Sequence, residues 1–334
     1  MKPYKKLLAA ASAVALSLSL TGCVTPKPIA SPAMGADYRV AIVKQLDHAS
    51  LDEIAQAAVR RLEAIGAERG LDIACEIYSG QGDESVLNQI GAQIIADGVD
   101  AILPIATTAA QLMAVAAEET GTPVIYGAVS DPAAADLLGI DHVTGTSDAL
   151  NTTLILDMML AQNPAVRQVG LLYSLSEPNS AQPIAEARAY LEAKGIACEE
   201  RTANTNDEVI AAAGALIAAG VDAVFTPTDN IIMAAELAIA PELAAAGIPH
   251  YAGADSFVRN GAFATCGVHY GELGAQTADL AFRVLTGGMD DIEDYYLVEG
   301  GIITVNTETA ATLGADYSAF ASMGTVVEVT TTEE

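Results

Sequence analysis

The chain has 334 residues, with 15 Lys or Arg against 43 Asp or Glu, a formal net charge of −28 and 51% apolar residues. A chain this apolar can bury enough surface to offset the entropy lost on folding, so global disorder is excluded, and its length indicates two domains. A strongly negative surface repels phosphate backbones, which excludes nucleic acid as a partner.

The N-terminus has the pattern of a bacterial export signal. Three lysines within the first six residues precede an apolar stretch over residues 7–20, which is shorter than the ~20 residues that span a bilayer. Leu20-Thr21-Gly22-Cys23 follows and resembles a lipobox. We therefore expect residues 1–22 to be a lipoprotein signal peptide, Cys23 to carry the lipid, and residues 23–37, rich in Pro, Ala and Ser, to form a flexible tether. The alternative is a plain secretory signal. Removing residues 1–22 takes away three lysines and no acid, so the formal charge moves from −28 to −31.

After the tether, short β-branched runs alternate with alanine-rich segments of helical period. This alternation predicts βαβ units and a parallel sheet. Helices are expected at 51–68, where Ile54, Ala58, Leu62 and Ile65 share one face, and at 85–97. The strands predicted in this first half lie at residues 39–43, 72–78, 101–104, 124–126 and 143–144.

The second half repeats the plan of the first. Ile-Ala-Cys-Glu at 73–76 recurs at 196–199, and Gly-Val-Asp-Ala-Ile at 98–102 recurs with one change at 220–224. Because internal repeats indicate a duplicated architecture, we expect five equivalent strands. These strands are predicted at residues 168–173, 197–201, 223–226, 250–252 and 264–267.

A last helix over 271–285 and a strand pair near 295–305 are too short for a third domain. We expect them to return as swapped elements that complete the two sheets. The fold class is therefore α/β, with two Rossmann-like lobes, each a parallel sheet flanked by helices, joined by a three-segment hinge. Lobe 1 is predicted at 38–146 plus 270–290 and lobe 2 at 147–268 plus 295–330, with crossings near 145–148, 268–271 and 291–296.

Polar side chains gather in the loops that follow the predicted strands. Open parallel sheets bind ligands outside the carboxyl ends of their strands, so these loops should face one cleft. Helix capping explains many single Ser, Thr, Asp and Asn residues there, but not adjacent pairs such as Asp229 and Asn230. The predicted ligand-binding residues are Gln45, His48, Thr107, Thr108, Gln111, Ser130, Asp131, Ser147, Asp148, Asn179, Ser180, Asp229, Asn230, Asp255 and Phe257.

The residue types in these loops suit a zwitterion held between two lobes. Hydroxyls and helix N-termini favour a carboxylate, so we expect Thr107, Thr108 and Ser147 to hold one together with backbone amides. Asp229, with Asp255 as a second candidate, would hold the ammonium group. Phe257 follows Asp255 in a loop and is the best candidate for stacking on a ligand.

Several of these segments also carry a family resemblance. From Tyr38 to Ile292 the chain resembles the substrate-binding lipoproteins of ABC transporters, in the group with tryptophan- and tyrosine-binding members and the type I periplasmic-binding fold. The resemblance implies an exported protein, lipid-anchored at the outer face of the cell membrane or in the periplasm, that captures a small solute, commonly an aromatic amino acid, for a membrane permease. The segments that carry it are 47–48, 80–83, 105–107, 129–132, 143–148, 176–180, 227–230 and 253–255.

No nucleophile elbow, phosphate loop, dinucleotide fingerprint or zinc-helix motif occurs in the sequence. We therefore expect neither an enzyme nor a cofactor. The four histidines are far apart and no Cys-x-x-Cys pair is present, so no metal site is expected. The protein is expected to be a monomer. Two other functions stay open: a sugar or nucleoside binding protein of the same fold, and a ligand-sensing receptor subunit.

Overall fold

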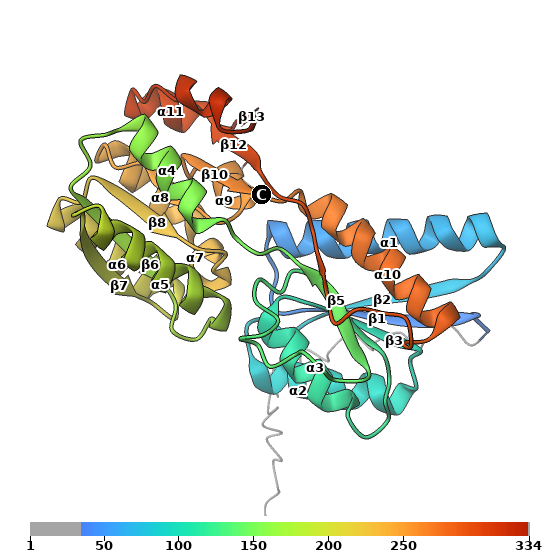
Figure 1. Cartoon of the computed structure of the whole chain (residues 1–334). Helices are drawn as coiled ribbons and strands as arrows, with labels where there is room; N and C mark the ends of the chain where they lie inside the picture. Colours follow the sequence, from blue (N-terminus) through green and yellow to red (C-terminus); the bar gives the residue numbers. More distant parts are fainter. Residues whose placement is uncertain (1–34, 333–334) are drawn as a thin grey trace, which may run out of the picture. The chain divides into compact units, whose positions relative to one another are not determined.

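The computed structural model describes residues 35–332 of the chain. The predicted signal peptide, Cys23 and most of the predicted tether lie outside the described residues. Within residues 35–332, no helix is long and apolar enough to cross a membrane. The described chain forms two parallel-dominated sheets with helices on both faces (Figure 1).

The first sheet has the strand order β11-β5-β4-β3-β1-β2, and every pairing in it is parallel. Helices α1 and α10 pack against each other on one face, and α2 and α3 pack together on the other (Figure 1). The strands are β1 (Tyr38–Lys44), β2 (Ile73–Ser79), β3 (Ala101–Ile105), β4 (Val124–Tyr126), β5 (Val143–Ser147) and β11 (Tyr296–Leu297), and the helices are α1 (Ala49–Arg69), α2 (Glu84–Asp97), α3 (Thr107–Ala117) and α10 (Tyr270–Gly287).

The second sheet has the order β13-β12-β10-β9-β8-β6-β7, in which the β10–β12 pairing is antiparallel. Helix α4 packs with α5, and α6 packs with α7 and α8. The strands are β6 (Gln168–Tyr173), β7 (Ala197–Thr202), β8 (Ala223–Thr226), β9 (His250–Ala252), β10 (Ala264–Gly267), β12 (Ile302–Asn306) and β13 (Thr325–Val329), and the helices are α4 (Thr152–Gln162), α5 (Pro178–Ala193), α6 (Asn206–Ala219), α7 (Asn230–Ala234), α8 (Glu236–Ala245), α9 (Asp255–Arg259), α11 (Thr307–Leu313) and the 3₁₀ helix η1 (Ser318–Ser322).

The repeat seen in the sequence is a repeat of topology. The order β5-β4-β3-β1-β2 in the first sheet matches β10-β9-β8-β6-β7 in the second. The central strands are apolar and buried along their length, as in β3, because helices cover both faces of a parallel sheet. On α1 the predicted face is buried, with Ile54, Ala58 and Leu62 fully inaccessible. The predicted α/β fold class is confirmed.

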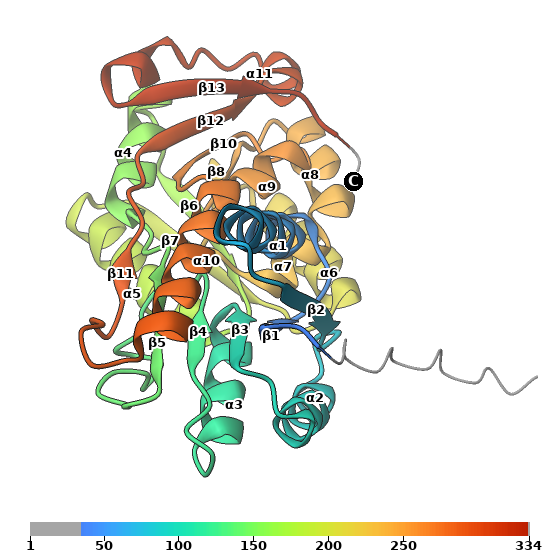
Figure 2. The ribbon, with the colours of Figure 1, turned by 90° about the vertical axis from the view of Figure 1, so that its right-hand side faces the viewer.

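The end of the chain differs from the prediction in one respect. Residues 295–305 do not form a strand pair, because β11 pairs with β5 in the first sheet while β12 pairs with β10 in the second. Within the described residues the chain therefore crosses between the sheets three times, at 148–151, 268–269 and 298–301, and the third crossing lies after the predicted 291–296. Residues 296–297 are predicted to belong to the second lobe, whereas β11 pairs with β5 in the first sheet. Figure 2 shows β12 and β13 extending the second sheet beside α11.

Candidate ligand-binding site

Loops from both sheets enclose a cavity of about 20 Å³, which is room for about one water molecule. Its lining residues follow the carboxyl ends of four strands in each sheet, namely β1, β3, β4 and β5 in the first and β6, β8, β9 and β10 in the second. The loop rule for parallel sheets therefore locates the site. The cavity is lined by His48, Ser50, Leu51, Ala106, Thr107, Ala128, Ser130, Asp148, Asn179, Thr228, Asp229, Asn230, Met233, Ala254, Phe257 and Tyr270.

The N-terminus of α3 opens toward this cavity without a side-chain cap. Its N-cap residue is Ala106, with φ 78° and ψ 161°, a backbone conformation that strains a residue with a Cβ atom. The buried Thr107 hydroxyl has no hydrogen-bond partner among the described residues. Because the first amides of a helix lack intrahelical acceptors and carry partial positive charge, this end of α3 suits an anionic group.

The corresponding helix of the second sheet, α7, is capped internally. Asp229 Oδ1 accepts hydrogen bonds from the amides of Ile231 (3.1 Å) and Ile232 (3.0 Å), and Oδ2 accepts from Ser174 N and Ser180 Oγ, both at 2.7 Å. Burial raises the pKa of Asp229, and these four hydrogen bonds oppose the rise. With its acceptor positions occupied, Asp229 stabilises its own helix. The prediction that it holds a ligand ammonium group disagrees with this geometry.

Asp148 has a different environment at the first crossing. Its Oδ1 accepts from Ser130 Oγ at 2.9 Å, and its Oδ2 accepts from the hydroxyl of Tyr270 at 3.2 Å. Burial raises the pKa of Asp148. Ser130 Oγ also lies 3.2 Å from Thr228 Oγ1 of the second lobe. Among the described residues each oxygen of this buried carboxylate has one side-chain donor, and the backbone amide of Asp148 itself adds a further hydrogen bond, which still leaves acceptor capacity for a ligand cation.

A chain of hydrogen bonds joins the two lobes beside the cavity. Gln45 Nε2 donates to Glu177 Oε1 (2.6 Å), Asn230 Nδ2 donates to Glu177 Oε2 (2.7 Å), and His48 Nε2 lies 2.9 Å from Asn230 Oδ1. Gln45 and His48 follow β1, whereas Glu177 precedes α5 of the second lobe. Burial first, and then the nearby Asp229 carboxylate, raise the pKa of Glu177 to about 8.

These contacts assign the hydrogen-bonding roles of two cavity residues. Asn230 uses its amide N–H on Glu177, so its oxygen accepts from His48 Nε2. Burial lowers the pKa of His48, which favours the neutral ring, and its Nδ1 is then an acceptor without a partner among residues 35–332. Asn179 likewise donates from Nδ2 to Thr228 O (2.6 Å) and leaves its buried Oδ1 unpartnered in the described chain.

Two aromatic rings complete the walls. Phe257 and Tyr270 line the cavity and are both buried. His250 meets the Phe257 ring edge-on, with centroids 6.1 Å apart and planes at 86°. A flat ligand could pack against such rings through its own apolar face.

The structure brings about half of the predicted residues into the cavity lining. The predicted residues that line it are His48, Thr107, Ser130, Asp148, Asn179, Asp229, Asn230 and Phe257. Gln45 and Ser180 lie behind it, where they bond Glu177 and Asp229. Ser147 also lies behind it and donates from Oγ to the carbonyl of Ser130 (3.2 Å).

The other predicted residues are directed elsewhere. Gln111 Nε2 donates to Ala135 O at 3.0 Å and lines a separate hollow on the first lobe. Asp131 accepts from the amide of Ala134 at 3.0 Å, which is a local turn contact. Thr108 does not line the cavity. Asp255 faces Arg259 at 3.4 Å instead of the cavity, so its predicted ammonium role disagrees with the structure.

Tyr270 and Glu177 are the main residues that the sequence prediction missed. Tyr270 is the first residue of α10 and directly follows the second crossing, at 268–269, which begins after β10. The rule that selected the loops after the other strands could therefore have found it. Glu177 lies in the loop after β6, so the same rule could have found it, but its bond to Gln45 of the first lobe required the structure. Within residues 35–332, no group of His, Cys, Asp or Glu side chains could hold a metal ion.

Residues 39–319 match the family model described as ABC transporter substrate binding protein. The chain is 29% identical over 280 residues to a tyrosine-binding protein of Clostridioides difficile, covering 82% of this chain and 80% of that one. It also resembles a solved Streptococcus pneumoniae ABC domain in complex with L-Trp, with 26% identity, a TM-score of 0.79, and 87% of this chain and 99% of that chain covered. A ligand-free, open substrate-binding protein with adhesive properties from Clostridium difficile matches with 26% identity and a TM-score of 0.66, over 88% and 100% of the two chains.

Proposed function

Because the chain belongs to the family of ABC transporter substrate-binding proteins, we propose that it captures a free aromatic amino acid in this cavity and delivers it to a membrane permease. Members of the family are extracytoplasmic and bind small ligands. The tyrosine-binding relative and the L-Trp complex support an aromatic ligand, and Phe257 and Tyr270 offer rings to pack against it.

One observation carries the proposal: the cavity combines a site for an anion with a site for a cation. The uncapped α3 N-terminus and the unpartnered Thr107 hydroxyl suit a carboxylate. The free acceptors His48 Nδ1 and Asn179 Oδ1, together with the Asp148 carboxylate, suit an ammonium group. A free amino acid presents both groups, whereas a neutral sugar presents neither.

Asp148 takes the role that we first expected of Asp229. Its carboxylate has one side-chain donor on each oxygen among the described residues, and burial raises its pKa. A bound ammonium group would stabilise the ionised form and compensate the cost of desolvating the charge. Asp229 has no comparable capacity, because its four hydrogen bonds come from its own lobe.

Ligand entry requires the lobes to separate, because the cavity of about 20 Å³ is smaller than an amino acid. The bonds of Gln45 to Glu177 and of His48 to Asn230 bridge the two lobes and would break on opening. A ligand that contacts both α3 and Asn179 reaches both groups only when the lobes close, so its binding energy favours the closed state.

We also propose that residues 1–22 are removed and that the protein is anchored through lipid on Cys23, as a monomer. The basic start, the apolar stretch over 7–20 and the lipobox-like Leu20–Cys23 support this. Expression with a labelled fatty acid tests it. The wild-type chain should take up label and the Cys23→Ser variant should not; equal labelling of both would contradict the proposal.

The binding proposal is tested by calorimetry on residues 24–334 with the twenty amino acids, common sugars and nucleosides. L-Trp, L-Tyr or L-Phe should bind. Analogues then separate the two charge sites: tryptamine lacks the carboxylate and indole-3-propionate lacks the ammonium, so each should bind far more weakly than L-Trp. Binding of a sugar or nucleoside with no response to any amino acid would overturn the amino-acid assignment and favour the alternative ligand class.

A further inference from the structure

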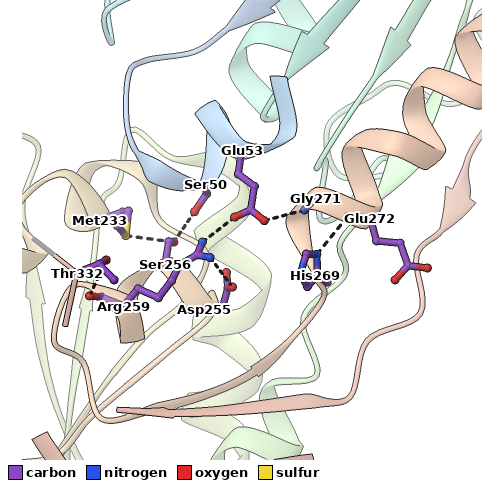
Figure 3. A network of polar contacts seen from close by, with 10 residues as sticks. All are labelled: Ser50, Glu53, Met233, Asp255, Ser256, Arg259, His269, Gly271, Glu272 and Thr332. Carbon is purple, nitrogen blue, oxygen red and sulfur yellow. Dashed lines mark hydrogen bonds and ion pairs between the residues drawn. The ribbon is translucent and has the colours of Figure 1, made fainter. Parts of the chain in front are cut away.

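We propose that Glu53 and Arg259 form a latch between the lobes, and that this latch sets the ligand affinity without touching the ligand. Glu53 lies on α1, which packs in the first lobe, and Arg259 ends α9 in the second lobe. The Arg259 Nη2–Glu53 Oε2 distance is 2.7 Å. The latch, meaning these two residues, is shown in Figure 3.

The Glu53 carboxylate joins three segments of the chain. Besides Arg259, it accepts a hydrogen bond from the amide of Gly271 to Oε1 at 3.1 Å (Figure 3). Gly271 lies in the first turn of α10, directly after the second crossing. One carboxylate on α1 thereby contacts α9 of the second lobe and the first turn of α10, directly after the second crossing, and both of its oxygens have donors of positive character.

Arg259 is itself held in place. Its Nη1 lies 3.4 Å from Asp255 Oδ2 on the same helix, and its carbonyl accepts from the amide of Thr332 at 2.9 Å. The Arg259 and Glu53 side chains are 27% and 23% exposed. A charge pair that is partly desolvated and oriented by neighbours is screened less by water than an exposed pair.

The latch is coupled to the cavity through short pieces of chain. Ser50, one turn before Glu53, lines the cavity and contacts the Ser256 hydroxyl across the lobes (Figure 3). Phe257 follows Ser256, and Tyr270 precedes Gly271; both rings line the cavity.

Glu53 and Arg259 themselves line an outer groove of about 870 Å³ that adjoins the cavity, since His48 and Met233 line both. Closing the latch therefore brings both cavity walls together from outside.

The test is a double-mutant cycle of Glu53→Gln, Arg259→Gln and the double variant in residues 24–334, with L-Trp and L-Tyr as probes. Each single variant should bind about 3- to 10-fold more weakly, mainly through faster dissociation. The double variant should be no weaker than the weaker single, because both changes break the same ion pair between the lobes. The matched control is Arg61→Gln, since Arg61 pairs with Asp279 within the first lobe, and its affinity should be unchanged.

The affinity arm rests on the proposed ligand, so a second arm measures closure directly. Small-angle X-ray scattering of the ligand-free proteins should give a larger radius of gyration for Glu53→Gln and Arg259→Gln than for wild type or Arg61→Gln. Equal radii, or additive losses in the double variant, would overturn the latch. If neither probe binds wild type, the ligand assignment fails while the scattering comparison still decides on the latch.

Discussion

Two buried carboxylates at the cavity, Asp148 and Asp229, differ in what their oxygens contact. Asp229 receives four hydrogen bonds from its own lobe, three of them from backbone amides. Asp148 receives only one side-chain donor on each oxygen. A sequence shows only that both acids precede helices, so the difference between a helix cap and a ligand contact emerges from the three-dimensional contacts.

The Asp148→Asn variant should lose affinity for an amino acid. A neutral amide cannot compensate the buried ammonium, so binding should weaken by about 2–5 kcal/mol. Calorimetry with L-Trp and L-Tyr measures this loss. The control, Asp229→Asn, should lower the unfolding midpoint, because a cap costs about 1–2 kcal/mol, and should affect binding less. A larger binding loss in Asp229→Asn than in Asp148→Asn would contradict the assignment.

Glu177 predicts a pH dependence of stability. Folding raises its pKa from 4.5 to about 8 through burial and the nearby Asp229, so the folded state favours the protonated acid. This contribution is complete below about pH 4.5 and is lost as the pH rises through about 8, on the order of a few kcal/mol. Protonation is accommodated because Gln45 Oε1 has no partner among the described residues and, after an amide flip, would accept a hydrogen bond from the protonated Glu177 carboxyl.

Unfolding measured from pH 5 to pH 8.5 checks this dependence against Glu177→Gln. The difference in stability between the variant and wild type should shift in favour of the variant as the pH rises, because glutamine stays neutral. A difference that does not change with pH would show that Glu177 keeps an ordinary pKa in the folded state.

At the scale of elements, the close packing of α1 on α10 depends on a glycine. A Cβ atom at Gly274 of α10 would lie 2.4 Å from the carbonyl oxygen of Ile54 and 2.9 Å from Ala57 Cβ on α1. Backbone cannot move aside as a side chain can, so Gly274→Ala should cost about 1–3 kcal/mol of folding free energy. Chemical denaturation measures this cost.

Gly287→Ala is the matched control in the same helix, because a Cβ atom there meets nothing within 4 Å. That variant should be neutral or slightly stabilising, since alanine has the higher helix propensity. Equal destabilisation by both substitutions would mean that packing against α1 is not the cause.

The strands of both sheets follow from local sequence, whereas the last elements do not. Buried parallel strands such as β4 and β8 begin and end at the predicted residues, because continuous apolar runs bounded by polar loops are a strong local signal. Strand β11 has only two residues and pairs with β5, far away in the chain. Such a pairing depends on tertiary contacts, as does the bond of Glu177 to Gln45 across the lobes.

For the whole molecule, the excess of acidic residues should make stability depend on salt. With 43 acidic against 15 basic residues, like charges dominate the surface and repel one another more in the compact state than in the unfolded chain. Screening shortens the range of this repulsion from about 10 Å at 0.1 M salt to about 3 Å at 1 M. The unfolding midpoint of residues 24–334 should therefore rise between 0.1 and 1 M NaCl, by about 1–2 °C for ~1 kcal/mol.

The same screening acts on the Glu53–Arg259 latch in the opposite direction. Salt should weaken this attraction while it relieves the general repulsion, so the midpoint and the affinity for L-Trp should respond differently to NaCl.

In the Glu53→Gln variant the midpoint should still rise with salt, but the affinity should depend on salt less than in wild type, because the charge pair is already lost. Measuring both at 0.1 and 1 M NaCl, at equal L-Trp, separates the effects. A midpoint that falls with salt would show that repulsion between acidic side chains does not control the salt response, and an equal salt dependence of affinity in the two proteins would contradict the latch.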